Sequence, residues 1–409
     1  MNRLTLFGYA KTTKAIAKRF GPATFFDDKI VVPHKDDEKN TLLPPSLFDP
    51  QKSKLEIPSP GFPPNHPLIQ KSKNLISEYD LFLSNKFNLP FSIHNLPFTI
   101  WISGTNGKTT TTQMVTHLLQ SKGAISGGNI GKPLAKLDAK SPIWVLETSS
   151  FTLHYTKYAK PDLYLLLPIT PDHLKWHGGK ENYIADKLSP LKKMREGEAI
   201  ILPKEFANNH TDGFKIPYSS YSDLADYFGI DEKRVNFEGA FLLDAILALA
   251  VAKILFDEID YDKINSFKLD PHRQEKIEDS KGRLWINDSK ATNIDATIQA
   301  LVPFKDKKIL LILGGDDKGV DLTPLFYALK SYNVTIFAIG KNCEKIAKLS
   351  NLYDIECHIE KRIDNAVATI NIVHNLNSVA ILSPAAASLD QFTSYTKRGD
   401  TFKELISSF

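Results

Sequence analysis

Residues 103–112 have the sequence SGTNGKTTTT and follow directly on the apolar segment 98–102. Glycines in such a loop allow a tight turn and bring backbone N–H groups close to phosphate oxygens. A lysine and a threonine at the start of the next helix supply a cation for the terminal phosphates and a hydroxyl ligand for Mg²⁺. The segment predicts a nucleotide-binding loop made of Gly104, Thr105, Asn106, Gly107, Lys108, Thr109 and Thr110. The alternative is a polar N-terminal cap that contains a lysine by chance.

Two further polar side chains follow apolar segments of the central part of the chain. Glu147 comes directly after IWVL, and His173 comes after LYLLLPIT and a short polar turn. Side chains at the carboxyl ends of parallel strands face the ligand crevice, where a carboxylate can bind Mg²⁺. Glu147 could instead be a solvated acid, and His173 a capping residue. Lys187, in a helical segment, is either a surface lysine or a third member of this site.

Three polar segments of the last third of the chain also follow apolar segments. They are NDSKATN at 287–293, GGDDKG at 314–319 and SPAAAS at 383–388. Each alone could be an ordinary turn between a strand and a helix. Together they predict one shared cleft that holds a ribose, a phosphate or a substrate carboxylate.

The elements that must position these residues alternate between short apolar strands and helices. The chain opens with a strand at 4–7, a helix to residue 20 and a second strand that ends at Asp27. This βαβ start places acids where a Rossmann-like domain binds a ribose, and the later alternation predicts parallel sheets flanked by helices. We therefore expect an α/β protein with three domains: a Rossmann-like domain at 1–93, a central ATPase-type sheet domain at 94–269 and a second Rossmann-like domain at 270–409.

The composition sets the broad class of protein. A chain of 409 residues that is 42% hydrophobic and 24% charged fits a globular protein with more than one core. The net charge of +4 gives no case for nucleic acid. Two cysteines without metal-binding spacing favour a reducing cytoplasm, and the sequence leads us to expect neither a signal peptide nor a bilayer-spanning segment. We expect a cytoplasmic monomer without membrane insertion.

Taken in order, these segments resemble those of the Mur ligase family. The resemblance runs from about Trp101 to the C-terminus and rests on SGTNGKTT, GGNIG at 127–131, LETSSF, TPDH, YxxxK at 183–187, PHR at 271–273, NDSKATN, GGDDKG and LSPAAASLDQF. GTNGK and PHR are shared with folylpolyglutamate synthetases. NDSKATN with SPAAASLDQF, and the short N-terminal block, resemble most closely the branch of the family that adds D-glutamate.

The resemblance implies a role for each matching residue. Lys108, His173 and Lys187 would be catalytic, and Arg273 and Asp288 would bind ATP together with the phosphate loop. Mg²⁺ would be held by Thr109, Glu147, His173 and Lys187. Lys187 matches the lysine that the family carbamylates, which converts an ammonium group into a carboxylate-like metal ligand.

The two other substrates have their own expected residues. Asn129 would contact the muramoyl substrate, and Thr12, Thr13, Asp27, Ser59 and Gly61 are the expected contacts with its uridine nucleotide. D-glutamate would be held by Thr292, Lys318, Ser388 and Tyr395. Ala386 stands where the family often has cysteine, and Tyr395 where phenylalanine is usual; neither difference removes a charge.

The implied activity is ATP-dependent addition of D-glutamate to UDP-N-acetylmuramoyl-L-alanine through an acyl phosphate, in peptidoglycan precursor synthesis. ATP and Mg²⁺ would be the cofactors, and the third domain would close on ATP. Two alternatives stay open at this point. Another amide ligase of the superfamily, such as a folylpolyglutamate synthetase, would keep the ATP residues without binding a UDP-sugar. A non-enzymatic nucleotide switch would have no need of Lys187.

Overall fold

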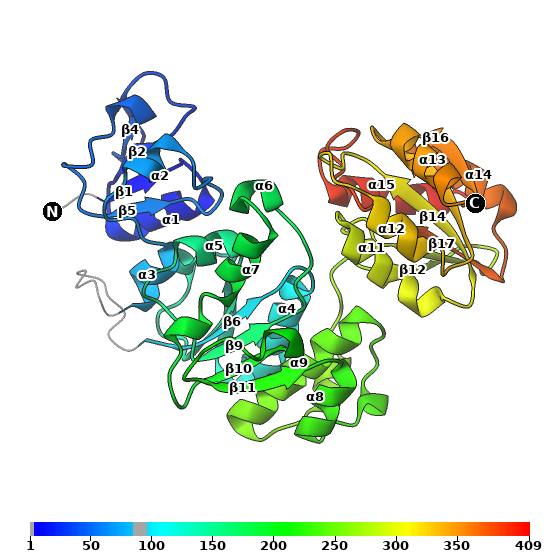
Figure 1. Cartoon of the computed structure of the whole chain (residues 1–409), viewed down its shortest axis with the longest axis horizontal. Coiled ribbons are helices and arrows are strands. Elements are labelled where there is room, and N and C mark those ends of the chain that lie inside the picture. The colour runs from blue at the N-terminus through cyan, green and yellow to red at the C-terminus, as the bar shows by residue number, and fades with distance from the viewer. Residues whose placement is uncertain (1–3, 85–95) are drawn as a thin grey trace. The chain divides into compact units, whose positions relative to one another are not determined.

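The computed structural model describes residues 4–84 and 96–409 and divides into two compact units (Figure 1). Unit 1 comprises Met1–Asn236 and Leu243–Ser266, and unit 2 comprises Phe237–Leu242 and Phe267–Phe409. The expected domain boundary between residues 93 and 94 lies outside the described residues. The three-domain division therefore stays a prediction, although the chain forms three separate sheets.

The first sheet of unit 1 is built from short strands in the order β3-β4-β2-β1-β5. Its strands are β1 (Thr5–Phe7), β2 (Thr24–Phe26), β3 (His34–Lys35), β4 (Thr41–Leu43) and β5 (Glu56–Pro58). Helix α1 (Lys11–Phe20) buries Ala15 and Ile16 and connects β1 to the parallel strand β2. The expected βαβ start is therefore confirmed. Helices α2 (Pro67–Lys71) and α3 (Glu78–Leu83) follow β5.

The second sheet of unit 1 is parallel, with the strand order β11-β10-β9-β6-β8-β7. Its strands are β6 (Phe98–Ser103), β7 (Ala124–Gly128), β8 (Ile143–Glu147), β9 (Leu163–Leu166), β10 (Ala199–Pro203) and β11 (Phe214–Tyr218). The associated helices are α4 (Lys108–Leu119), α5 (Ser150–Tyr155), α6 (Leu174–His177), α7 (Lys180–Leu188), α8 (Tyr221–Phe228), α9 (Ala240–Phe256) and α10 (Tyr261–Asn265). Because β6 lies between β8 and β9, the phosphate loop adjoins the segments that follow both neighbours.

The sheet of unit 2 has the order β12-β13-β17-β14-β15-β16, and its described pairings are parallel except for that of β12 with β13. Its strands are β12 (Glu275–Glu278), β13 (Leu284–Asn287), β14 (Lys308–Gly314), β15 (Val334–Ile339), β16 (Cys357–Lys361) and β17 (Ser378–Leu382). Its helices are α11 (Ile294–Leu301), α12 (Thr323–Leu329), α13 (Cys343–Leu352), α14 (Ile363–Val373) and α15 (Tyr395–Ile406). Since β13, β17 and β14 are neighbours, the three polar segments leave the sheet at one edge. The predicted α/β class is confirmed.

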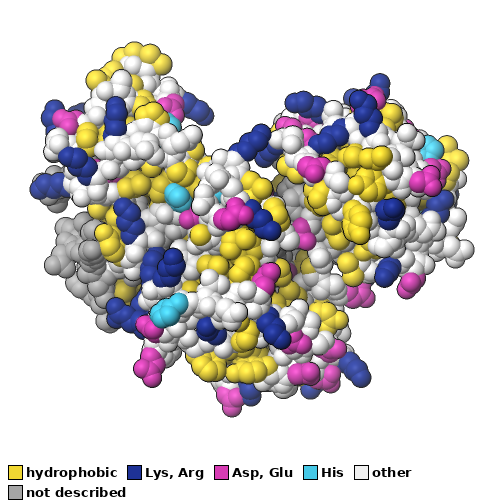
Figure 2. Space-filling view, viewed as in Figure 1, with side chains coloured by type: hydrophobic (Ala, Val, Ile, Leu, Met, Phe, Trp, Pro, Cys, Tyr) yellow, Lys and Arg dark blue, Asp and Glu magenta, His cyan; other side chains and the backbone are white. Residues whose placement is uncertain are grey.

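The distribution of charged side chains on the described surface agrees with the small net charge of +4. Basic and acidic side chains are interspersed on the face shown in Figure 2, so neither sign dominates the described part of that face. Among the described residues, no helix has both the length and the apolar character that crossing a membrane requires.

Helix α3, which follows the first sheet, forms hydrogen bonds with loops of the second sheet of unit 1. The buried Asp80 carboxylate accepts the backbone N–H groups of Lys157, Tyr158 and Ala159 at 2.8, 2.7 and 2.8 Å. The buried Glu78 carboxyl accepts the N–H of Ala135 at 3.2 Å. Burial raises the pKa of Glu78 to about 8, against the opposing effect of its backbone hydrogen bonds. Glu78 is therefore mostly a neutral acid at pH 7.

Glu78 gives the protein a pH-dependent stability. Because its folded pKa lies above its ordinary value of 4.5, the folded state binds the proton more tightly, and stability falls as the pH rises from 4.5 towards 8. We expect Glu78→Gln, which cannot ionise, to gain stability relative to wild type by roughly 1.4 kcal/mol per pH unit across this window. Urea unfolding at pH 5, 6, 7 and 8 measures the difference. The exposed Glu38→Gln is the control, and parallel curves for Glu78→Gln and wild type would contradict the prediction.

Candidate active site

The predicted phosphate loop connects β6 to the N-terminus of α4 and depends on its two glycines. Gly104 has φ +138° and Gly107 has φ +82°, which are conformations that side chains disfavour. A Cβ on Gly104 would lie 2.4 Å from the Leu167 Cβ, and one on Gly107 would lie 2.6 Å from the Asp244 Oδ1. The loop therefore turns where no larger residue fits, and it leads into a helix N-terminus that favours anions.

Lys108 and Thr105 fix the shape of this loop. The Lys108 ammonium donates to the carbonyl oxygens of Gly104 at 3.1 Å and of Thr105 at 2.5 Å. The Thr105 hydroxyl donates to the Thr170 carbonyl at 2.8 Å and lies 3.0 Å from the Tyr183 hydroxyl. Thr105 thus connects the loop to the segment after β9 and to α7. The Lys108 ammonium group lies against the backbone of the loop.

Glu147 contacts two other predicted site residues, Thr109, which is expected to bind Mg²⁺, and Asn129, which is expected to contact the muramoyl substrate. Glu147 ends β8 and is buried, with 3% of its surface exposed. Its Oε2 accepts the Thr109 hydroxyl at 2.8 Å, and its Oε1 accepts the Asn129 amide at 2.7 Å. A carboxylate and a hydroxyl beside a phosphate loop are oxygen donors of the kind that Mg²⁺ prefers, so this set fits the ion. The solvated-acid interpretation of Glu147 is wrong.

Lys187 is buried and lies against the phosphate loop. Its side chain is 1% exposed, and its Nζ donates to the Gly104 carbonyl at 2.6 Å. Burial, together with the charge of Lys108, holds the pKa of Lys187 well below 10.5, although nearby carboxylates oppose this. The surface-lysine interpretation is therefore wrong. The lowered pKa favours the neutral amine, which is the form that reacts with carbon dioxide.

His173 precedes α6 in an unusual backbone conformation. Its φ is +52°, and its side chain does not cap the helix. The imidazole lies 3.5 Å from an Asp172 carboxylate oxygen and packs against the Phe151 ring, with the two centroids 4.8 Å apart. His173 thus occupies the N-cap position of α6 without a hydrogen bond from its side chain to the helix, and its role as a metal ligand stays a prediction.

The residues predicted for the uridine nucleotide lie at the carboxyl edge of the first sheet, in the first turn of α1 and in the loops after β2 and β5. The Thr13 hydroxyl donates to the Gly8 carbonyl at 2.5 Å, and Asp27 accepts the Tyr9 backbone N–H at 2.7 Å. These contacts shape the loop between β1 and α1. The other predicted contacts are Thr12 in α1 and Ser59 and Gly61 after β5. Their binding of a nucleotide stays a prediction.

The predicted nucleotide residues of unit 2 lie around the end of β13. Asp288 is buried and accepts the Ser383 hydroxyl at 2.9 Å and the Gln274 N–H at 3.2 Å. Burial raises its pKa to about 7, against the effect of these hydrogen bonds. Arg273 is largely buried, with its Nε 4.0 Å from an Asp270 carboxylate oxygen.

The sequence analysis missed Arg398, which joins the three polar segments of unit 2. Its buried guanidinium donates to the Ser289 hydroxyl at 3.0 Å and carbonyl at 2.9 Å, and to the Ala386 carbonyl at 3.1 Å. A Cβ on Gly315 would lie 3.3 Å from its Nη1. Arginine is usually exposed, so the sequence alone offers no signal for this role. These polar segments carry Thr292, Lys318 and Ser388, three of the residues predicted for D-glutamate. The fourth, Tyr395, is the first residue of α15, the helix that contains Arg398.

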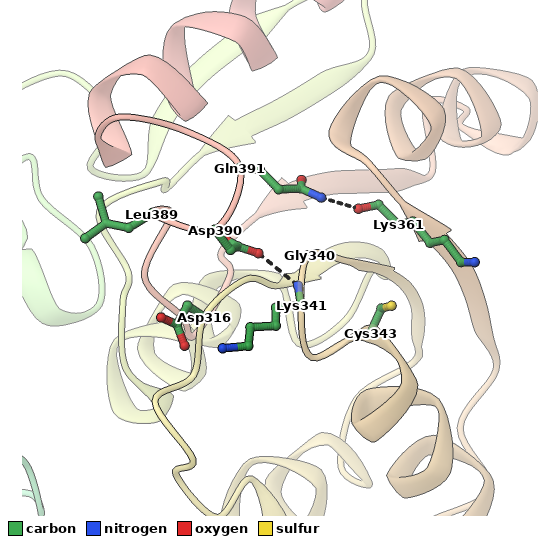
Figure 3. A pocket seen from close by; sticks show the side chains of 8 residues that line it. All are labelled: Asp316, Gly340, Lys341, Cys343, Lys361, Leu389, Asp390 and Gln391. Atoms are coloured by element: carbon green, nitrogen blue, oxygen red, sulfur yellow. Dashed lines mark hydrogen bonds between the residues drawn. The ribbon is translucent and has the colours of Figure 1, made fainter.

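A pocket of about 560 Å³ opens at the carboxyl ends of β14 and β15 (Figure 3). Across it, Asp390 accepts the Lys341 backbone N–H at 2.8 Å, and the Gln391 amide donates to the Lys361 carbonyl at 2.7 Å. Its lining residues are Asp316, Gly340, Lys341, Cys343, Lys361, Leu389, Asp390 and Gln391. None of the four residues predicted for D-glutamate lines this pocket, but Asp316 belongs to the same GGDDKG segment as Lys318, and Leu389 directly follows Ser388.

A glycine-containing loop between a strand of a parallel sheet and the N-terminus of a helix is typical of P-loop nucleotide-binding proteins. Comparison with known proteins narrows the class. Residues 102–236 match the Mur ligase middle domain. The chain is 53% identical to the UDP-N-acetylmuramoylalanine--D-glutamate ligase of Campylobacter jejuni and 44% identical to that of Helicobacter pylori, each over 99% of both chains. The chain belongs to the Mur ligase family.

Solved structures of other proteins share the fold at low sequence identity. A MurF ligase from Thermotoga maritima, solved in complex with ADP, matches with a TM-score of 0.55 and 14% identity, covering 99% of this chain and 97% of that one. A folylpolyglutamate synthase from Mycobacterium tuberculosis, also complexed with ADP, matches with a TM-score of 0.52 and 13% identity, covering 76% of this chain and 91% of that one. These likenesses support the α/β architecture.

The clash that a Cβ on Gly104 would make with Leu167 predicts a loss of nucleotide binding on substitution. We expect Gly104→Ala to abolish measurable ADP binding by calorimetry, because its Cβ would displace either Leu167 or the loop itself. Gly229→Ala is the matched control, since Gly229 also has a positive φ but no atom within 4 Å of an added Cβ. The control should lose about 1 kcal/mol of stability and keep its ADP affinity. Unchanged ADP affinity in Gly104→Ala would contradict the loop assignment.

Proposed function

We propose that this chain is an ATP-dependent ligase that adds D-glutamate to UDP-N-acetylmuramoyl-L-alanine in the synthesis of peptidoglycan precursors. The observation that carries the proposal is full-length similarity, at 53% identity, to a relative named for this reaction. The meeting of Thr109, Asn129 and Glu147 beside the phosphate loop supports it, since one cluster joins residues expected for ATP, the muramoyl substrate and Mg²⁺.

The reaction has two steps. The alanyl carboxylate attacks the γ-phosphorus of ATP, forming an acyl phosphate as ADP leaves. The amine of D-glutamate then attacks the acyl carbon, loses a proton and forms the amide as phosphate leaves. In the first step two anions must approach each other, and Lys108 at the phosphate loop supplies fixed positive charge for this.

The metal site would be formed by oxygen and nitrogen donors around Glu147. Thr109 and Glu147 already share a hydrogen bond, and His173 and Lys187 are the further ligands we propose. Mg²⁺, when bound, would neutralise charge on the phosphates and the attacking carboxylate. Thr109 and Glu147 would hold the ion through their side-chain oxygens.

Lys187 would serve this site as a carbamate. Its neutral amine attacks carbon dioxide, forming an N–C bond and releasing one proton, and the product is an anionic carbamate. The lowered pKa and the burial of Lys187 support this step, because a buried ammonium would repel the metal.

The incoming amino acid would bind in unit 2. A dianion needs a fixed cation and several neutral donors, which Lys318, Thr292 and Ser388 would supply, with Tyr395 as an apolar wall. We assign the contacts with the uridine nucleotide to Thr12, Thr13, Asp27, Ser59 and Gly61. We assign the ATP contacts of unit 2 to Arg273 and Asp288. We place the protein in the cytoplasm as a monomer; its two free cysteines fit a reducing compartment.

The proposal predicts strict dependence on the configuration of glutamate. With UDP-N-acetylmuramoyl-L-alanine, ATP and Mg²⁺, we expect D-glutamate to release phosphate and form the amide, whereas L-glutamate reacts poorly. Inverting the α-carbon moves either the amine or a carboxylate away from its partner. Phosphate release and product mass measure the outcome. Equal rates with both enantiomers, or a preference for a diamino acid or a folate, would favour a sister ligase.

A pair of lysine variants refines the same test. Lys318→Ala should raise the KM for D-glutamate roughly tenfold to a hundredfold, since a charged hydrogen bond contributes about 1.5–3 kcal/mol. Its ADP affinity should stay unchanged. Lys330→Ala, which removes an exposed lysine directly after α12, is the matched control and should keep the wild-type KM.

A further inference from the structure

A chain of hydrogen bonds behind the proposed metal site is not used by the reaction described above. The His177 Nδ1 lies 2.7 Å from the Asp186 Oδ2, and its Nε2 lies 3.0 Å from the Ser150 hydroxyl. Because an ionised carboxylate only accepts, His177 Nδ1 carries a proton and donates it to Asp186. On its other side the same carboxylate accepts from the His154 Nδ1 at 3.0 Å.

His177 is the most enclosed member of this chain. Its side chain is 0% exposed, whereas those of His154 and Asp186 are 32% and 18% exposed. Its ring stacks on Phe151 at a centroid distance of 5.6 Å and an interplanar angle of 5°. Phe151 also packs on the His173 ring at 4.8 Å. The orientation of His177 is therefore fixed by contacts on both ring nitrogens and on its face.

The partners of His177 lie on the segments that carry the proposed metal ligands. Ser150 begins α5, three residues after Glu147. His177 ends α6, whose first residue follows His173, and its backbone N–H donates to the His173 carbonyl at 3.3 Å. Asp186 directly precedes Lys187 in α7. The His177 side chain, at the end of α6, thus hydrogen-bonds to residues of both α5 and α7.

We propose that His177 is a positioning residue, which holds the segments bearing Glu147, His173 and Lys187 at the spacing that a divalent cation requires. The inference rests on the proposed function, because that function assigns the three ligands. His177 does not touch a substrate; it acts through Ser150 and Asp186. Groups of this kind behind a metal site typically change metal affinity by a factor of 10 to 100.

The same side chains could be considered as ligands of an ion of their own. The geometry favours the hydrogen-bonded arrangement, because Asp186 lies between the two imidazoles as the common acceptor of both. The ring centroids of His154 and His177 are 6.4 Å apart. The experiment separates the two arrangements by including Zn²⁺.

The test measures the affinity for Mn²⁺, a spectroscopic substitute for Mg²⁺, by electron paramagnetic resonance with ADP present. His177→Phe keeps the aromatic volume and the stacking on Phe151 but loses both hydrogen bonds. We expect its Mn²⁺ affinity to fall at least about tenfold, and its Mg²⁺ requirement in turnover to rise equally, with the KM for D-glutamate unchanged. His177→Asn, whose amide can replace the Nδ1 donor to Asp186, should recover part of the loss.

His154→Ala is the matched control, because it removes the exposed donor to the same carboxylate and leaves His177 in place. Its Mn²⁺ affinity should stay within about twofold of wild type. Glu147→Gln marks the signal of the proposed ligand site. Urea unfolding of each variant reports its stability. If His177→Phe does not fold, the comparison of His177→Asn with His154→Ala decides the question.

Three results would overturn the inference. In the first, His177→Phe binds Mn²⁺ and depends on Mg²⁺ as the wild type does, and the wild type turns over normally. This result would refute the positioning role of His177 and leave the proposed function intact. A stoichiometric Zn²⁺ ion bound by wild type and lost in both histidine variants would replace the positioning role with a separate metal centre. A wild type without any Glu147-dependent Mn²⁺ site would refute the metal assignment of the proposed function and this inference with it.

Discussion

The burial of Lys187 against the phosphate loop constrains the chemistry of unit 1. An ammonium group taken out of water, close to the charge of Lys108, is strongly disfavoured, and this lowers the pKa of Lys187. The amine is held in place by the Gly104 carbonyl at 2.6 Å, so it cannot turn to solvent without breaking a buried contact. Conversion to a carbamate would replace the unfavourable cation with an anion that a metal ion neutralises.

The order of strands brings the other groups to this lysine. Placing β6 between β8 and β9 sets the phosphate loop beside Glu147 on one side and beside the segment that contains His173 on the other. Helix α7 then runs back to the loop and delivers Lys187. Thr105 in the loop contacts Thr170, which follows β9, and Tyr183 in α7, so the loop is connected to both segments. A local change in any of them would move the loop.

Sequence patterns predicted the elements well where burial dominates their formation. The apolar runs at 98–102 and 143–146 became β6 and β8, and the polar residues after them lie at the expected edge. The phosphate loop was readable because glycine, lysine and threonine each have a local reason to be there. Thr109 and Glu147 were assigned to one site, and the structure joins them directly.

Long-range polar contacts were not readable from the sequence. Arg398 looks like a surface residue of an amphipathic helix, yet it is buried beneath three loops. His177 and Asp186 are nine positions apart, and their pairing depends on how α6 and α7 fold back onto α5. Patterns of hydrophobicity report which face is buried, but not which buried polar groups find each other.

Nuclear magnetic resonance of protein equilibrated with ¹³C-bicarbonate reports whether Lys187 carries a carbamate. Lys193 is the matched control, because burial also lowers its pKa and its Nζ donates to a carbonyl, that of Thr156, at 2.6 Å. We expect a carbamate carbon signal that disappears in Lys187→Arg and persists in Lys193→Arg. A wild type without this signal, or a signal that survives in Lys187→Arg, would contradict a carbamate at Lys187.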